Sequence, residues 1–148
     1  MTSSKQIFDE FPLPDKLKYK DTEQTFEKYL FEDDYSKVSR EYVYIKNFYF
    51  PTGTTKKIPF CFIRGIYFKP QSDSTGMKFK GWGMSLSPVW WACDIFRNLH
   101  DDPTLYNVVI DCGETTYKGF TTTSINGLLL AVRPYLEKET IIREGFPF

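Results

Sequence analysis

His100 is the only histidine of the chain and is the first residue to consider for acid–base or metal chemistry. It stands near Asp94, Asp101 and Asp102, and the chain also contains three cysteines. A hydrolytic triad needs a histidine beside a nucleophile, and a structural zinc site needs several Cys or His ligands at short spacing. Because there is one histidine and no C-x-x-C pair, we predict neither a metal site nor a catalytic triad.

Cys112 is the thiol to test for reactivity, since it lies in a turn beside Asp111. A reactive cysteine needs a neighbour that lowers its pKa, and the adjacent sequence offers none. A Cys112–His100 pair is the remaining catalytic alternative. The glycines of Gly81-Trp-Gly83 lack the length and the basic residue of a phosphate-binding loop. We therefore predict a protein that is not an enzyme and needs no cofactor.

Aromatic residues form the strongest binding candidate. Exposed tryptophans mark binding surfaces, whereas buried ones belong to the core. On a strand, Trp90 and Trp91 would point to opposite faces, and on a helix they would diverge by about 100°. We therefore expect one of the two to lie near solvent and predict a contact site for a protein or peptide partner. Its predicted residues are Trp82, Trp90, Trp91 and Phe96.

Basic residues concentrate in a second candidate site. Residues 56–80 contain six basic residues against one acid, Asp73, for a net charge of +5. If the strands curl, several of these side chains would share a rim that attracts a phosphate, an anionic lipid or an acidic partner. The alternative is that they solvate an outer face and protect an edge strand. The predicted anion- or lipid-binding residues are Lys56, Lys57, Arg64, Lys78 and Lys80, with Lys69 nearby.

Charge and length restrict the function classes. The 148 residues carry 19 basic and 19 acidic side chains, so we predict no general affinity for nucleic acid. No apolar run reaches about 18 residues, and the N-terminus lacks the pattern of a signal peptide. Three widely spaced cysteines are typical of free thiols in a reducing compartment. These features predict a single intracellular domain in the cytoplasm.

The pattern of apolar residues predicts the elements that position these sites. Phe, Tyr and Trp make up 18% of the chain, which favours β-structure. The last element is a helix, because Ile125, Leu128, Leu129 and Val132 follow the helical period with Leu136 beyond them. Thr123 or Ser124 would cap it. The predicted strands and hairpin partners are 26–31, 42–50, a bent run 57–68, 77–85, 105–111 and 115–120.

Three segments are less regular. Residues 1–24 are polar and proline-punctuated, which predicts a flexible arm, and residues 141–148 show no pattern and are expected to form a tail. The stretch 88–96 fits either a helical turn or an aromatic-rich loop. Residues 25–140 then form a mainly β (α+β) domain. We predict a partly open antiparallel β-barrel of about seven strands, with bends at glycines and the C-terminal helix plugging one end.

This order of elements resembles the pleckstrin-homology (PH) superfold. Residues 44–64 (YIKNFYFPTGTTKKIPFCFIR) look like the core hairpin of small bacterial PH-like domains, and Trp82 and the hairpin at 109–113 are also similar. The resemblance covers residues 26–137, and the stretch 85–103 departs from it. PH-like domains are binding modules for phosphoinositides, peptides or protein surfaces. The basic pattern of the phosphoinositide-binding subset is not in register here, so the resemblance implies a binding role without specifying a lipid.

The sequence leaves three roles open. The first is a non-catalytic module for a protein or peptide partner, and the second is binding of an anionic lipid or phosphate through the basic rim. The third is binding of an apolar small ligand in a barrel cavity lined by aromatic residues. Oligomerisation is a further alternative, because the run 60–68 is apolar on both faces and must be covered.

Overall fold

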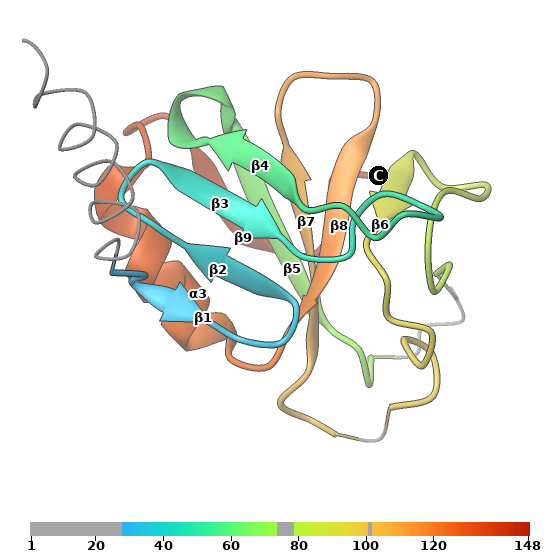
Figure 1. Cartoon of the computed structure of the whole chain (residues 1–148). Coiled ribbons are helices and arrows are strands. Elements are labelled where there is room, and N and C mark those ends of the chain that lie inside the picture. Colours follow the sequence, from blue (N-terminus) through green and yellow to red (C-terminus); the bar gives the residue numbers. More distant parts are fainter. Residues whose placement is uncertain (1–27, 74–78, 101) are drawn as a thin grey trace, which may run out of the picture.

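The computed structural model describes residues 28–73, 79–100 and 102–148, so the predicted arm 1–24 lies outside the described residues. The described part contains nine strands, one α-helix and two 3-10 turns (Figure 1). The strands are β1 (Phe31–Glu32), β2 (Ser36–Val38), β3 (Tyr42–Ile45), β4 (Lys56–Pro59), β5 (Gly65–Pro70), β6 (Val89–Trp91), β7 (Tyr106–Asp111), β8 (Tyr117–Thr122) and β9 (Ile141–Glu144). The helix is α3 (Ile125–Val132), and the 3-10 turns are η1 (Phe60–Phe62) and η2 (Arg133–Tyr135).

The strands form two sheets. Sheet A is an antiparallel meander in the order β1-β2-β3-β4, and sheet B has the order β6-β8-β7-β5-β9. In Figure 1 sheet A crosses in front of sheet B, and α3 lies at the end where β1 and β2 are found. The prediction of a mainly β fold with a short C-terminal helix is confirmed.

The structure differs from the predicted partly open antiparallel barrel and C-terminal tail in three respects. The strands belong to two separate sheets in the described residues, with no closed barrel. Two pairings, β5 with β9 and β6 with β8, are parallel. The supposed tail contains β9, in which Ile141 pairs with Gly65 and Glu144 with Phe68. A four-residue strand is too short to show periodicity, so only its docking on β5 defines it.

Several local predictions are confirmed. The hairpin of β7 and β8 turns at Cys112–Glu114, where Gly113 has a φ of +75° and its N–H donates to the Asp111 carboxylate at 2.7 Å. The bent run 57–68 divides into β4, η1 and β5. In the described part of the predicted strand 26–31, residues 28–31, only Phe31 is in a strand, and the described part of 77–85 forms just one isolated bridge, between Gly83 and Trp91.

The helix α3 begins where the sequence places it. Ser124 is the N-cap, and its side chain accepts a hydrogen bond from the N–H of Gly127 at 3.1 Å. Ile125, Leu128, Leu129 and Val132 are buried against the sheets, whereas Leu130 on the opposite side is 71% exposed. Among the described residues no helix is long and apolar enough to cross a membrane.

Sheet B separates two apolar clusters because successive residues of a strand point to opposite faces. The inner cluster fills the space between the two sheets and α3, with Ile66, Val108, Ile110 and Phe120 contributed by sheet B. The outer cluster lies on the other face of sheet B. It consists of Tyr67, Val89, Trp91 and Val109, with Phe79, Tyr117 and Phe146 packed against them.

Candidate binding surface

Trp82 and Trp90 join the segment that contains them to the loop that follows β3. Both indole N–H groups donate to the carbonyl oxygen of Phe48, at 3.1 Å from Trp82 and 2.7 Å from Trp90. The N–H of Cys93 donates to the carbonyl of Asn47 at 2.8 Å. We call residues 79–100 the tryptophan segment. These bonds hold it against the loop that follows β3.

Within the tryptophan segment, β6 places Trp90 and Trp91 on opposite faces of sheet B. Trp90 packs against the inner cluster and is partly buried, whereas Trp91 belongs to the outer cluster and is fully buried. The expectation that one ring reaches solvent assumed a sheet covered on one face only. Because both faces are covered, each ring has an apolar environment, and Trp91 is not available to a partner. Gly119 allows this packing, since a Cβ there would collide with the Trp91 ring.

Arg97 anchors the second half of the tryptophan segment from inside. It is 1% exposed, and its guanidinium lies 4.4 Å from the Trp91 ring centroid. Its Nη1 donates to the Asn107 side chain at 2.7 Å and to Thr121 Oγ1 at 2.8 Å. Its Nη2 donates to the carbonyl of Ala92 at 2.8 Å. Burial lowers the pKa of Arg97 to about 10, so the side chain keeps its charge at neutral pH.

Asp94 is the buried anion that accompanies this cation. Its carboxylate accepts from Thr121 Oγ1 at 2.6 Å and from Gln71 Nε2 at 3.2 Å, and it lies 3.0 Å from His100 Nε2. Burial alone would raise the pKa of Asp94. The bonds from Thr121, His100 and Gln71 and the charge of Arg97 outweigh burial and lower it. The network therefore fixes the backbone from Asp94 to His100 on β7 and β8.

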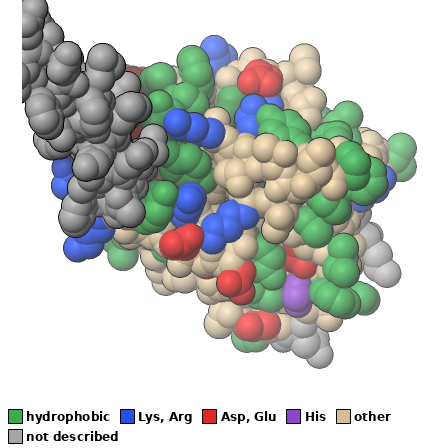
Figure 2. Space-filling view, in the orientation of Figure 1, with side chains coloured by type: hydrophobic (Ala, Val, Ile, Leu, Met, Phe, Trp, Pro, Cys, Tyr) green, Lys and Arg blue, Asp and Glu red, His purple; other side chains and the backbone are tan. Residues whose placement is uncertain are grey.

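Large apolar side chains stand exposed on this anchored scaffold. Leu86 is fully exposed, Leu99 is 75% exposed and Ile95 is 67% exposed. Figure 2 shows hydrophobic side chains gathered over this side of the molecule, beside the histidine. The Phe50 ring packs edge-on against Trp82, with ring centroids 5.0 Å apart. We define the apolar edge as Phe50, Met84, Leu86, Ile95, Phe96 and Leu99, all of which are exposed.

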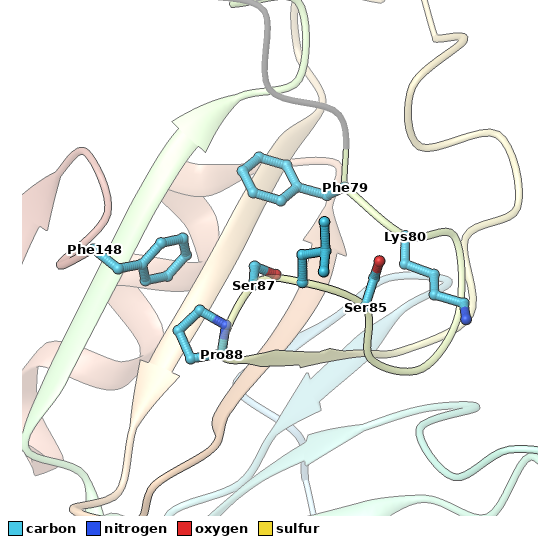
Figure 3. Close-up of a pocket in the computed structure, with 7 residues that line it drawn as sticks. Phe79, Lys80, Ser85, Ser87, Pro88 and Phe148 are labelled. Carbon is cyan, nitrogen blue, oxygen red and sulfur yellow. The ribbon is translucent and has the colours of Figure 1, made fainter.

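A cavity of about 350 Å³ opens beside the apolar edge, where the tryptophan segment meets the C-terminal residues (Figure 3). Its apolar lining comes from Phe79, Leu86, Pro88 and Phe148, and its polar lining from Lys80, Ser85 and Ser87. The cavity is thus a gap in the layer that covers the outer cluster, and it lies outside any barrel.

The predicted partner-binding residues have different environments. Phe96 is exposed and lies on the apolar edge. Trp82 and Trp90 instead hold the tryptophan segment in place through their hydrogen bonds to the carbonyl of Phe48. The prediction missed Phe50, Leu86, Ile95 and Leu99. A signal for Leu86 was present, because an isolated leucine between Ser85 and Ser87 has no apolar pattern that would bury it.

The predicted basic residues that the structure describes have different surroundings, although Lys56 and Arg64 both lie near the β7–β8 turn. Lys57 lies on the outer face of sheet A, with its Nζ 3.9 Å from the Tyr42 ring centroid. Its neighbour Lys56 points to the other face, because side chains alternate along β4. The Arg64 guanidinium lies against Gly113 in the β7–β8 turn, and Lys80 lines the cavity. Lys78 lies outside the described residues.

The residues considered for catalysis are far from one another. Cys112 follows the end of β7, whereas His100 contacts Asp94 near Asn107 at the start of that strand. Burial raises the pKa of the Cys112 thiol, which disfavours the thiolate. In the described ranges no group of three His, Cys, Asp or Glu side chains is arranged to hold a metal ion.

No model of a known protein family matches the chain, and no curated protein or solved structure matches it. The resemblance to PH-like domains therefore stays a prediction.

Proposed function

We propose that the protein is a non-catalytic binding module that recognises a protein partner through the apolar edge. The observation that carries this proposal is a set of large apolar side chains held exposed on a backbone that is fixed from inside. Six such residues from two adjoining loops are exposed, three of them by more than 65%. Exposed apolar groups on a soluble domain are costly unless a partner covers them.

Rigidity favours binding by this surface. A loop that is already ordered loses little conformational entropy when a partner covers it. Arg97 and Asp94 are buried and hydrogen-bonded, and Trp82 and Trp90 share the carbonyl of Phe48. A central apolar anchor with polar surroundings is the usual composition of a protein interface. We infer a partner that offers an apolar pocket or groove to Ile95, Phe96 and Leu99.

Site-specific crosslinking tests the proposal. A photoreactive amino acid at position 96 should capture a partner in cells, whereas the same group at Leu130, which is 71% exposed on α3, should not capture it. The captured protein is then purified, and its affinity is measured directly. Ile95→Ser with Leu99→Ser should weaken binding at least tenfold, and the matched control Leu130→Ser should leave it unchanged. Equal affinity of the two variants would reject the apolar edge as the interface.

A further inference from the structure

The two faces of sheet B are covered by different kinds of structure. The inner cluster lies under sheet A and α3, which are regular elements. The outer cluster is covered by the beginning of the tryptophan segment and by the last residues of the chain. The Phe79 ring is 5.2 Å from Trp91 and 5.4 Å from Phe146, measured between centroids. Two short segments therefore form the cover, and the cavity lies where they meet.

The cavity has an apolar end and a cationic end. In Figure 3, Phe148 lies at one end and Lys80 and Ser85 lie at the other, with the Phe79 ring and Ser87 between them. Phe148 is held in place by Tyr117 and Phe146, with ring centroids 5.7 and 5.5 Å away. The volume of about 350 Å³ is at the lower end of the range for small-molecule sites, roughly 300–1,000 Å³.

Lys80 is the charged residue of the lining, and no acidic side chain lines the cavity. Its Nζ lies 3.4 Å from the carbonyl oxygen of Met84, a long contact with a neutral acceptor. No ion pair joins Lys80 to an acid within the described residues. An anion at this end would meet the ammonium of Lys80 and the hydroxyl group of Ser85, both of which donate hydrogen bonds.

We propose that this cavity binds a small apolar carboxylate, with its ring or short chain between Phe79 and Phe148 and its carboxylate at Lys80. The apolar end excludes the hydration shell of a free inorganic anion, and the cationic end favours an acid over an alcohol or an amine of the same shape. This site shares Leu86 with the proposed protein interface, so the tests of the two proposals use other residues.

The indole N–H of Trp91 provides a local reporter. It is buried without a hydrogen-bond partner in the described part of the chain, and its ring packs on Phe79, which lines the cavity. The indole N–H groups of Trp82 and Trp90 both donate to Phe48 and serve as internal controls. Ligand in the cavity should change the magnetic environment of Trp91 and leave the other two nearly unchanged.

The test is an NMR titration of the ¹⁵N-labelled full chain with 3-phenylpropionate, 3-phenylpropanol and 3-phenylpropylamine at pH 7. With the acid we expect a saturable shift of the Trp91 indole signal. The alcohol should bind with an affinity about fivefold weaker than the acid, and the amine should not bind. Lys80→Met should make acid and alcohol equal, whereas the control Lys57→Met should not. The absence of a saturable shift, or an unchanged preference for acid in Lys80→Met, overturns the proposal.

Ser87→Phe tests the location, because the larger ring would fill the cavity. It should abolish binding of both probes while the remaining spectrum keeps its dispersion, and retained binding would exclude this cavity as the site. Ile95→Ser with Leu99→Ser should leave the affinity for 3-phenylpropionate unchanged. A negative result for ligand binding in the cavity can therefore be distinguished from a negative result for partner binding at the apolar edge.

Discussion

The inner and outer clusters share sheet B but differ in what covers them. The inner cluster is built mainly from aliphatic residues, with Phe48, Phe60 and Phe120, and is closed by sheet A and α3. The outer cluster is built around the rings of Tyr67 and Trp91 and is closed by loops and the C-terminal residues. The cover of the outer cluster leaves the cavity of about 350 Å³, and a second cavity of about 440 Å³ lies on the inner side between α3 and β1, where Phe31 and Ala131 are part of its lining.

We infer that the inner face of sheet B contributes mainly to stability and that the outer face carries the candidate binding sites. The inner cluster is the larger of the two and should supply most of the stability, because the free energy gained on burial grows with the apolar area removed from water. The outer side carries both the apolar edge and the cavity. The buried charges of Arg97 and Asp94 hold the tryptophan segment on sheet B, since their network reaches Asn107 on β7 and Thr121 on β8.

The largest loss of stability is expected from Phe120→Ala. Phe120 is fully buried in the inner cluster, and truncation should lower the free energy of unfolding by about 4 kcal/mol. Urea denaturation followed by circular dichroism measures the change. Phe62→Ala is the matched control, because Phe62 is 60% exposed, and it should change stability by about 0.5 kcal/mol or less. A loss below about 2 kcal/mol for Phe120→Ala would contradict the assignment of stability to the inner cluster.

Arg97→Met should be the next largest change. It leaves the Asp94 carboxylate buried without its compensating charge and removes two donors from Asn107 and Thr121. We expect a loss of about 3 kcal/mol in the same denaturation experiment. Arg133→Met, at an exposed position after α3, should behave like the wild type. If both arginine variants lose little stability, the buried network does not anchor the tryptophan segment.

Phe146→Ala should produce a smaller and more local loss. Phe146 is partly buried in the outer cluster, so about 1–2 kcal/mol is expected. Hydrogen exchange should accelerate around β6 and β9 while the amides of β2 and β3 keep their protection. Uniform acceleration over both sheets would mean that the two clusters unfold as one unit and that their difference has no dynamic consequence.

Acid should destabilise the outer side through Asp94. The pKa of Asp94 is lowered in the folded state, so its contribution to stability is present above the unfolded pKa, near 3.9, and is lost as the pH falls through the folded pKa. His100, Arg97 and Tyr35 are the titratable groups around it. Between pH 5 and 2, Asp94→Asn should show a smaller loss of stability than the wild type. Identical pH profiles of the two proteins would assign the acid sensitivity to other carboxylates.

Local elements with a strong period could be predicted from residues alone. The stripe of Ile125, Leu128, Leu129 and Val132 predicts α3, and Ser124 is its cap as expected. Cys112-Gly-Glu114 between two apolar runs predicts the β7–β8 hairpin. In both cases neighbours in the sequence supply the interactions, so no distant segment is needed to define the structure.

The candidate site depended on distant segments and was predicted only in part. Phe96 was found because it is a large apolar residue near the tryptophans, and it is exposed. Phe50 was missed because it reaches the apolar edge through a contact with Trp82 that no local pattern encodes. Arg97 reads as a surface charge in the sequence, yet it is buried because Asn107, Thr121 and the Trp91 ring surround it.

By itself the sequence determined the β-rich class, the position of the helix and the central hairpin, because short-range periodicity and turn residues specify them. Tertiary structure alone decided that β6 and β9 join sheet B in parallel and that both of its faces are covered. It thereby decided that Trp91 is core while Leu86 and Ile95 are exposed. The physical reason is that burial of a side chain depends on which distant segment covers it, and residue type does not encode that choice.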